Sequence, residues 1–359
     1  MDAILNKTTP DRADRDHCAV ESVVMRGGTS RGPVLLAASL PSDPRERDRL
    51  VVRLVGGDAY QTDGLGGGNP TTSKVVVVDP TPKKQDSVDI DYAVGNIVVG
   101  HNAVDWSGTC GNMTATVPIF ALEEGFVSAS SAGKLRLRNL STGGLIETFI
   151  KDPSSHKRGD EVVVRTAYLN PAGMVLRSVL PTGAAREQFV IDGRSYEASI
   201  IDVTHPYLFL RYDQVVGRED TSNPAIVSLV EKIRGAACVR LGITAKAEEA
   251  MAVSPAIPRV VLLHSGTAVG EGLRITAISM GKFIATVPVT AAMCLAAARH
   301  LKYTLVAEIA DEQCSGDELR VIASAARLTA IAQVDADGRI MSTAVDRTVR
   351  SIMRGTAWA

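Results

Sequence analysis

Residues 288–301, PVTAAMCLAAARHL, limit the fold more than any other part of the chain, because they form a helix pattern that is apolar nearly all round. Pro288 stands in the first turn, where proline is favoured. A helix on the surface of a soluble protein shows a polar face, so a helix without one has to be enclosed on every side. We expect β-strands to wrap around this helix.

A second apolar segment follows Cys110 within residues 105–125, DWSGTCGNMTATVPIFALEEG. We predict a helix over about residues 110–124, kinked or shortened by Pro118, because an internal proline removes a hydrogen bond and clashes with the preceding turn. A thiol at the start of such a helix lies beside free amides and the positive end of the helix dipole. That position lowers a thiol pKa and favours a bound anion. The alternative is a small buried cysteine in a tight turn.

A weak internal repeat relates the two halves of the chain. Residues 21–25 (ESVVM), then Thr29 and VLL at 34–36, resemble residues 197–201 (EASII), then Thr204 and LFL at 208–210. The two apolar helices are separated by a similar offset, about half of the chain. Two copies of one β-rich unit, each around a central helix, would produce this pattern. Chance similarity between two hairpins is the alternative.

Short patterns give the other elements. Strands are expected at residues 21–25, 33–37, 75–78, 259–263 and 273–279, and helices at 42–54 and 223–236. Residues 26–32 are expected to form a glycine-rich connection between the first two strands.

Composition excludes several classes of protein. The 359 residues carry a net charge of −1 and only 4% aromatic side chains, which argues against nucleic acid and an anionic membrane surface as partners. The five cysteines include no C-x-x-C pair, and their odd number argues against a disulfide framework. The first twenty residues are polar, and no apolar run is long enough for a membrane span. We expect a cytoplasmic protein.

Two glycine-rich segments carry cations. Residues 64–74, GLGGGNPTTSK, run into a strand, so they match neither a Walker A loop nor a Rossmann fingerprint, both of which open a helix. Their amides, hydroxyls and lysine suit a carboxylate, and residues 26–31, RGGTSR, have the same chemistry. Each could be a tight turn that uses glycine for positive φ. Two of them together with a candidate thiol indicate a site for a small anion. The histidines and cysteines show no zinc spacing, so no metal is expected.

The motifs together resemble the PrpF family. They are MRGGTSRG at 25–32, DGLGGG at 63–68 with TSK at 72–74, DWSGTCGN at 105–112 and SMGK at 279–282, and DRTVRSIMRG at 346–355 resembles the family's ending. The family contains 2-methylaconitate isomerases, methylitaconate Δ-isomerase, 4-oxalomesaconate tautomerase and related aconitate isomerases. The resemblance implies a diaminopimelate-epimerase-like α+β fold, with two similar β-barrel-like domains, each around a central helix, and a site between them.

We accordingly divide the chain into a mobile tail (1–18), an N-terminal barrel domain (19–185), a C-terminal barrel domain (186–340) and a C-terminal segment (341–359). Packing of that last segment against the first domain is one option. A homodimer is another open option.

The resemblance implies that Cys110 and Lys74 are the acid and base, without assigning which is which. The predicted substrate-binding residues are Gly27, Gly28, Thr29, Ser30, Arg31, Gly67, Gly68, Thr72, Ser73, Gly111, Asn112, His205, Lys282 and Thr290. Neither a cofactor nor a metal is implied. The chain departs from the family pattern at Arg31, where many members have lysine, at Thr204-His205-Pro206, where Asn-Pro is common, and at 323–326, where a His-Pro-Ser-Gly stretch is absent.

The leading hypothesis is a cofactor-independent isomerase of an unsaturated di- or tricarboxylate of the aconitate, 2-methylaconitate, methylitaconate or oxalomesaconate type. It would act by a 1,3-proton shift or by cis-trans isomerisation. One alternative is an amino-acid epimerase that uses two thiols, although Val289 and Thr290 stand where the second thiol would be needed. The others are an accessory protein for an aconitase-like dehydratase and a degenerate binding module.

Overall fold

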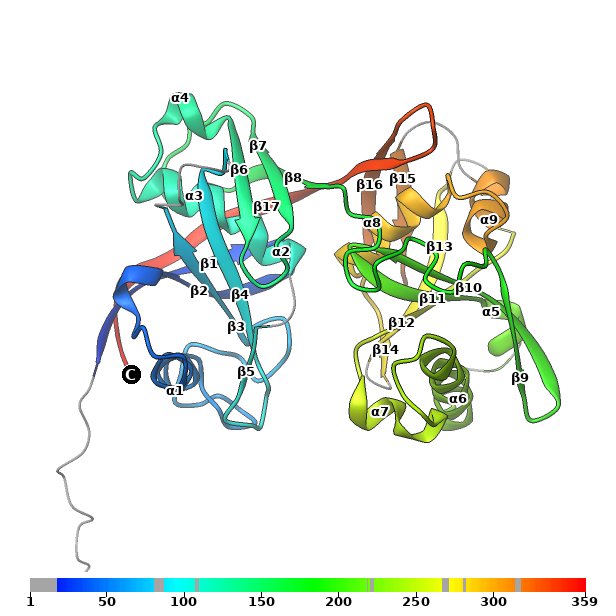
Figure 1. Cartoon of the computed structure of the whole chain (residues 1–359). Coiled ribbons are helices and arrows are strands. Elements are labelled where there is room, and N and C mark those ends of the chain that lie inside the picture. The colour runs from blue at the N-terminus through cyan, green and yellow to red at the C-terminus, as the bar shows by residue number, and fades with distance from the viewer. Residues whose placement is uncertain are drawn as a thin grey trace, which may run out of the picture.

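The structure is a computed structural model that describes residues 18–80, 87–106, 110–217, 219, 223–266, 271–279, 282–313 and 318–359. Two lobes of strands lie side by side, and each has a helix inside it (Figure 1). The fold is α+β, with two similar β-barrel-like domains, each around a central helix, as the sequence predicts. None of the helices in the described ranges is long and apolar enough to span a membrane.

The N-terminal lobe contains β1 (Ala19–Gly27), β2 (Ser30–Leu36), η1 (Ala37–Ser39), α1 (Pro44–Val55), β3 (Lys74–Asp79), β4 (Ile90–Ile97), β5 (Val104–Asp105), α2 (Gly111–Thr114), α3 (Thr116–Glu123), α4 (Ala129–Ala132), β6 (Lys134–Asn139), β7 (Leu145–Ile150) and β8 (Val162–Leu169). The C-terminal lobe contains β9 (Glu187–Ile191), β10 (Arg194–Val203), β11 (His205–Arg211), α5 (Tyr212–Val215), α6 (Pro224–Arg240), η3 (Ala247–Glu249), α7 (Ala250–Val253), β12 (Arg259–Leu263), β13 (Leu273–Ser279), β14 (Lys282–Ile284), α8 (Val289–Ala298), α9 (Leu305–Gln313), β15 (Glu318–Ile322) and β16 (Arg327–Val334). The last strand, β17 (Ile340–Trp358), belongs to both lobes.

The two lobes pair their strands in the same order and sense. In the first, β1 is antiparallel to β2, β2 parallel to β3, β3 antiparallel to β4 and β4 parallel to β6. In the second, β10 is antiparallel to β11, β11 parallel to β12, β12 antiparallel to β13 and β13 parallel to β15. Each half of the chain therefore folds as one copy of the same unit.

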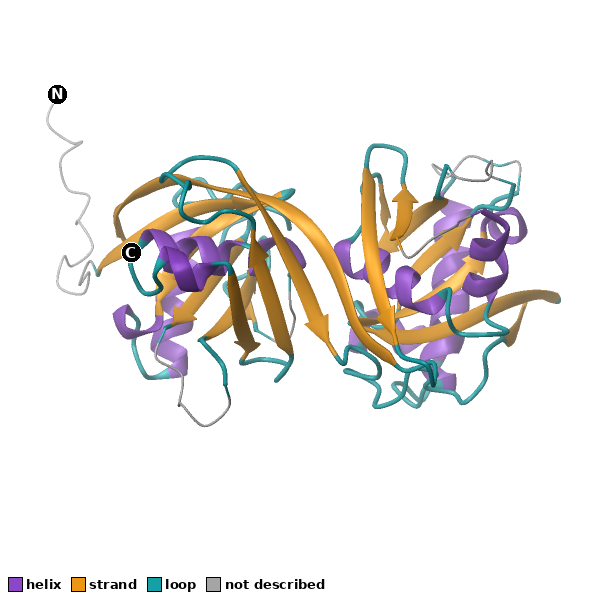
Figure 2. Cartoon of the chain, turned by 90° about the horizontal axis from the view of Figure 1, so that it is seen from above, coloured by secondary structure: helices purple, strands orange, loops and turns teal. Residues whose placement is uncertain are grey.

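The long strand β17 joins the lobes. It pairs antiparallel with β16 at its start, with β8 from Ser342↔Leu169 to Val349↔Val162, and with β1 from Gly27↔Val349 to Ala19↔Trp358. Figure 2 shows it as one continuous strand that passes from one lobe to the other. Residues that are more than 300 positions apart are thereby hydrogen-bonded neighbours.

The helix α8 is enclosed as its apolar sequence requires. Every residue from Val289 to Ala298 is buried, and strands β10, β11, β15, β16 and β17 pack around it. In the other lobe, residues Thr116–Ala121 of α3 are buried against β1, β2 and β17. One hydrophobic cluster contains side chains from both helices, so the apolar core continues from one lobe into the other.

The segment after Cys110 is two helices rather than one. It breaks at Ala115, between α2 and α3. Pro118 explains the break, because a proline ring clashes with the carbonyl four residues before it, which here belongs to Thr114 at the end of α2. The Thr116 hydroxyl donates to the Met113 carbonyl at 2.7 Å across the break.

The predicted connection over residues 26–32 is too long. Gly27 pairs with Ser30, so only Gly28 and Thr29 form the turn between β1 and β2. Gly28 has φ +51°, a left-handed conformation that glycine adopts without steric cost. Other expected elements are close to their predicted ranges. For example, α1 begins after Asp43, whose side chain accepts hydrogen bonds from the backbone amides of Arg45 and Glu46.

Candidate active site

The turn between β1 and β2 is packed directly on the start of α2. A side chain at Gly27 would place its Cβ 2.0 Å from the carbonyl oxygen of Asn112, and one at Gly28 would come within 2.4 Å of the Asn112 side-chain oxygen. The Asn112 amide donates to the Thr29 hydroxyl at 3.0 Å and to the Ser30 hydroxyl at 3.3 Å. Only glycine at both positions allows this approach, so the turn and α2 form one rigid unit.

Cys110 stands at the N-terminal cap of α2. Its backbone is extended and its side chain does not cap the helix. The thiol sulfur lies 3.9 Å from the Ser30 hydroxyl, and the residue is partly buried against the apolar core. The structure therefore brings together Cys110, the turn residues and Asn112, as the sequence predicts. Residues 107–109 of the motif lie outside the described residues.

Arg347 joins this group, and sequence reasoning missed it. It lies on β17, and its Cδ is 2.8 Å from the position of a Cβ at Gly28. Its Nη1 donates to the Asp346 carbonyl at 2.8 Å, whereas its buried Nε has no hydrogen-bond partner among the described residues. Burial lowers the pKa of Arg347 to about 10, and the nearby negative charge of a Cys110 thiolate opposes this lowering. The guanidinium stays charged at neutral pH.

Arg26 holds the turn in place. Its Nη1 donates to the Gly28 carbonyl at 3.0 Å and to the Thr348 hydroxyl at 2.9 Å, and its guanidinium pairs with Glu161. These contacts fix the turn against β17. This arginine lies next to the predicted substrate loop in the sequence, but its side chain is used to hold the turn.

Lys74 is the first residue of β3 and lies beside Gly32 on the parallel strand β2. Its ammonium group donates to the Asn96 side-chain oxygen at 2.6 Å, and it has no carboxylate partner among the described residues. Ser30, the neighbour of the Cys110 sulfur, begins the same strand β2. The Lys74 backbone thus lies next to Gly32 and the Cys110 sulfur next to Ser30, so both residues neighbour the first three residues of β2.

The glycine-rich loop that precedes Lys74 is organised by Gln61, which the sequence did not single out. Its side-chain oxygen accepts the Gly68 amide at 2.9 Å and the Ser73 hydroxyl at 2.8 Å, and its nitrogen donates to the Gly56 carbonyl at 3.0 Å. The Ser73 hydroxyl also donates to the Asn69 carbonyl at 2.7 Å. The Gly68 amide and the Ser73 hydroxyl, which the sequence predicts as substrate-binding groups, therefore form hydrogen bonds within the loop.

The outer part of the same loop faces Arg31. A Cβ at Gly67 would lie 3.3 Å from Arg31 Nη2 and 2.5 Å from the Thr72 hydroxyl. The Arg31 amide donates to the Thr71 carbonyl at 3.0 Å. Gly67, Thr72 and Arg31 are thus adjacent, next to the β1–β2 turn.

In the C-terminal lobe, Thr290 and His205 surround the start of α8. The Thr290 hydroxyl lies 2.7 Å from the Tyr207 hydroxyl and accepts a hydrogen bond from Arg259 Nη1 at 3.4 Å. The His205 Nε2 is 2.9 Å from the Ala256 carbonyl. Burial and, to a lesser degree, the charge of Arg259 lower the pKa of His205 to about 3, so the ring is neutral at physiological pH.

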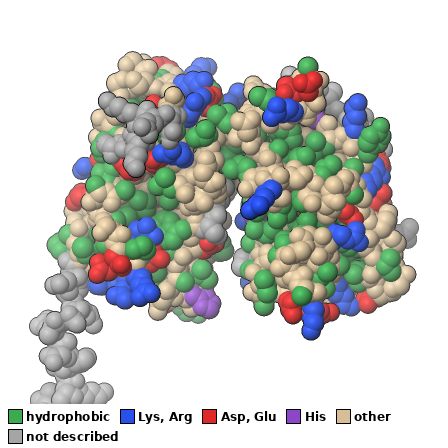
Figure 3. Space-filling model, in the orientation of Figure 1, with side chains coloured by type: hydrophobic (Ala, Val, Ile, Leu, Met, Phe, Trp, Pro, Cys, Tyr) green, Lys and Arg blue, Asp and Glu red, His purple; other side chains and the backbone are tan. Residues whose placement is uncertain are grey.

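The two helix starts meet at the interface of the lobes. A Cβ at Gly111 would lie 2.7 Å from Val289 Cγ1 and 3.6 Å from the Tyr168 hydroxyl. A cavity of about 300 Å³ is lined by residues of both lobes: Asn139, Ser141, Thr142, Gly144, Ile146, Tyr168, Met174, Val175 and Thr204. Figure 3 shows that the lobes touch in its upper half and separate below into a notch. Tyr168, one of the residues that line this cavity, is thus also a neighbour of Gly111, which follows Cys110.

Two other expectations concern residues away from this group. Lys282 is exposed on β14, and no contact of the described residues joins it to Cys110 or to Thr290. A second thiol, as a two-cysteine epimerase requires, is absent from the described residues at the start of α8, where Pro288 is the cap. Cys294 is fully buried in α8, and burial raises its pKa. No three His, Cys, Asp or Glu side chains are grouped for a metal ion in the described part of the chain.

Two similar lobes around central helices, with a thiol where the helix starts meet, define the diaminopimelate-epimerase-like fold. Superposition with a solved methylitaconate-Δ-isomerase gives a TM-score of 0.80 at 27% identity and covers 96% of both chains. A hydroxyproline epimerase from Agrobacterium vitis shares the fold at a TM-score of 0.50 and 13% identity, covering 95% of this chain and 92% of that one. The sequence profile described as PrpF protein matches residues 17–359, and the chain belongs to the PrpF family.

Characterised relatives in this family are isomerases. The chain is 29% identical to the 3-methylitaconate isomerase of Eubacterium barkeri, over 95% of this chain and 97% of that protein. It is 28% identical to the (4E)-oxalomesaconate Δ-isomerase of Novosphingobium sp. (strain KA1), over 97% and 99%. It is 29% identical to the 2-methyl-aconitate isomerase of Shewanella oneidensis, over 80% and 83%. The chain is an isomerase of the PrpF family.

Proposed function

We propose that this isomerase moves the double bond of an unsaturated di- or tricarboxylate by a 1,3-proton shift that uses Cys110 and Lys74. The observation that carries the proposal is the position of the Cys110 sulfur, beside the Ser30 hydroxyl and near Arg347, whose Nε has no partner among the described residues. The named substrates of three relatives, which are all polycarboxylates, support the substrate class.

The reaction conserves atoms and electrons within the substrate. One group removes a proton from the carbon γ to a carboxylate, and the electron pair of the broken C–H bond becomes the new β–γ double bond. The former α–β π electrons move towards the carboxylate as a dienolate. A proton then adds at the α carbon, so the double bond has moved by one position and no oxidant or reductant is consumed.

The polar groups around Cys110 suit the charge that develops in this step. A dienolate carries negative charge on the carboxylate oxygens, and fixed donors aimed at that charge lower the barrier. Thr29, Ser30 and the guanidinium of Arg347 offer such donors around the Cys110 sulfur. Lys74, whose ammonium is held by an uncharged amide oxygen rather than by a carboxylate, is the second proton-transfer group. Proton transfer needs each group within hydrogen-bond reach of the reacting carbon.

The experiment is incubation of the protein with aconitate, 2-methylaconitate, methylitaconate and oxalomesaconate in D₂O, followed by proton NMR. We expect one of these acids to gain deuterium and to change the position or geometry of its double bond. Exchange of none of them, with intact folding and measurable binding, would favour a binding protein. Exchange at the α carbon of an amino acid would favour an epimerase.

A further inference from the structure

The strand registers of the two lobes place two cations at equivalent positions. In the first lobe Gly32, the third residue of β2, lies beside Lys74, the first residue of β3. In the second lobe Tyr207, the third residue of β11, is paired with Arg259, the first residue of β12. Arg259 therefore occupies in the C-terminal lobe the place that Lys74 occupies in the N-terminal lobe.

The surroundings of Arg259 leave part of its guanidinium available. Nη1 donates to the Thr290 hydroxyl at 3.4 Å, in the first turn of α8, and the guanidinium also hydrogen-bonds to the Tyr207 hydroxyl. The buried Nε has no hydrogen-bond partner among the described residues. His205 beside it is neutral, so it adds no second positive charge. A buried donor without a partner costs free energy, and a bound carboxylate would remove that cost.

Arg347 shows the same property in the other lobe. Its Nε is also buried without a partner in the described chain, and its stem packs on the Gly28 turn beside Cys110. The two arginines are linked through the contact between the helix starts: Arg259 touches Thr290, which follows Val289, and Val289 packs on Gly111, which follows Cys110. Both arginines thus border the same junction of the lobes.

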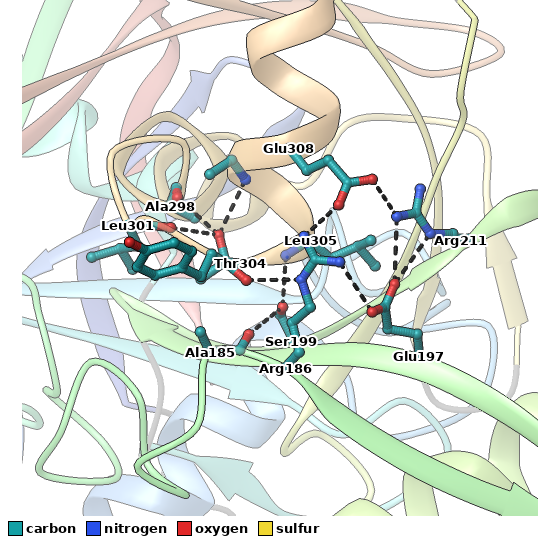
Figure 4. Close-up of polar contacts among 12 residues, drawn as sticks. Ala185, Arg186, Glu197, Ser199, Arg211, Ala298, Leu301, Thr304, Leu305 and Glu308 are labelled. Carbon is teal, nitrogen blue, oxygen red and sulfur yellow. Dashed lines mark hydrogen bonds and ion pairs between the residues drawn. The ribbon is translucent and has the colours of Figure 1, made fainter.

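Two other arginines of the C-terminal lobe, Arg186 and Arg211, are paired with carboxylates. In Figure 4, Arg186 and Arg211 each reach both Glu197 and Glu308. Neither Arg259 nor Arg347, both of which are partly buried, has a carboxylate partner within the described ranges, although a guanidinium drawn away from water is normally paired. The lack of a partner at both positions points to a ligand that supplies the two carboxylates.

We propose that Arg259 and Arg347 bind two carboxylates of the same substrate, one from each lobe, and so select for acids with at least two carboxylates. The inference rests on the proposed function for the substrate class. It assigns fixed binding charge to the C-terminal lobe at the position where the N-terminal lobe carries Lys74.

The test uses the full-length protein and three saturated acids that cannot react: propane-1,2,3-tricarboxylate, glutarate and butyrate. Their affinities are measured by calorimetry for the wild type, Arg259→Gln and Arg347→Gln. Arg320→Gln on β15 and Arg350→Gln on β17, both exposed, are the matched controls. Circular dichroism and the unfolding midpoint of each variant verify folding, and Arg259→Lys and Arg347→Lys keep the charge where a glutamine variant fails to fold.

We expect each glutamine variant to weaken the di- and tricarboxylate by about 10- to 100-fold, since a charge-assisted pair is lost. Butyrate has one carboxylate and can therefore contact only one of the two arginines. Substitution of the other arginine should leave the affinity for butyrate at the wild-type value. The controls should change affinity less than twofold. Equal losses for all three acids in both variants, or no loss in either, would overturn the inference.

The proposed function can fail separately from this inference. If the wild type isomerises a polycarboxylate while both glutamine variants keep its KM, the arginine assignment is wrong and the function stands. If no acid of the D₂O panel reacts but polycarboxylate binding depends on both arginines, the reaction is wrong and the binding assignment stands.

Discussion

The two lobes build the same strands and central helix, yet they place different chemistry at equivalent positions. The first lobe has Ser30 and Lys74 where the second has His205 and Arg259. The cap of the central helix is Cys110 in the first lobe and Pro288 in the second. A thiol and a lysine ammonium are groups that can donate or accept a proton in catalysis, whereas an arginine remains charged and a proline has nothing to transfer. Under the proposed function, one lobe performs the reaction and the other supplies fixed charge.

The largest expected effect comes from exchanging the two equivalent cations. Lys74→Arg should lower kcat by at least about 100-fold, because arginine does not give up its proton at neutral pH. Arg259→Lys should keep kcat and raise KM by about 3- to 10-fold, because lysine keeps the positive charge but lacks the two parallel N–H donors of a guanidinium. Steady-state kinetics on the reactive acid separates the two outcomes, with Lys232→Arg, in an exposed ion pair, as control. Equal effects on kcat at both positions would remove the proposed asymmetry.

The turn on α2 gives the next expected effect. Gly27→Ala forces a Cβ to within 2.0 Å of the Asn112 carbonyl oxygen, so the turn or the helix must move. We expect the free energy of unfolding to fall by about 2–4 kcal/mol and kcat to fall by about 10- to 100-fold through displacement of Cys110. Denaturation and kinetics measure these values. Gly355→Ala on β17, which has open space around it, is the matched control and should be neutral.

A smaller effect concerns pH and distinguishes His205 from its counterpart Ser30. The folded pKa of His205 is about 3, because of burial first and of Arg259 second, whereas an unfolded histidine titrates near about 6.5. Below that pH the unfolded chain binds a proton that the folded chain excludes, so stability decreases as the pH falls. Urea denaturation at pH 7 and pH 5 measures how far the free energy of unfolding falls between these pH values. We expect this fall to be smaller in His205→Gln than in the wild type, by up to about 2 kcal/mol. Ser30→Ala should leave the pH dependence as in the wild type, and an unchanged dependence in His205→Gln would contradict the burial of a neutral ring.

The smallest effect is expected at Lys282. The sequence motif places it among the substrate-binding residues, but its side chain is exposed on β14 and no described contact connects it to the helix starts. Lys282→Gln should change KM by less than about threefold, as an exposed charge acts weakly through water. A larger rise in KM at low ionic strength, absent in the exposed control Arg320→Gln, would return Lys282 to the site.

Much of the fold follows from local patterns. The apolar sequence of α8 predicts enclosure, and every one of its residues is buried. The repeat in two hairpins predicts two similar units because register and turn chemistry are local properties. The broken helix after Cys110 was only partly foreseen, since Pro118 indicates a disruption but not that it falls three residues earlier, at Ala115.

The candidate site was less predictable where it depends on distant pairing. Arg347 reaches Gly28 only because β17 returns across the whole molecule, and the C-terminal motif at 346–355 that contains it does not indicate this contact. Gln61 lies between turns, and its three hydrogen bonds exist only after the loop has closed. An alignment of the two hairpins alone does not show that Lys74 and Arg259 occupy equivalent positions. That equivalence depends on how each hairpin pairs in parallel with the strand that follows it.

The central claim is that the thiol of the N-terminal lobe carries proton transfer, and deuterium exchange of the reactive acid in D₂O tests it most directly. Exchange rates are measured by proton NMR for the wild type, for Cys110→Ser and for Cys18→Ser, whose cysteine is exposed and lies outside the site. We expect Cys110→Ser to lower the exchange rate by at least about 1,000-fold, because a serine hydroxyl is a far weaker acid than a thiol, while Cys18→Ser exchanges at the wild-type rate. Exchange by folded Cys110→Ser at more than about a tenth of the wild-type rate would contradict the account.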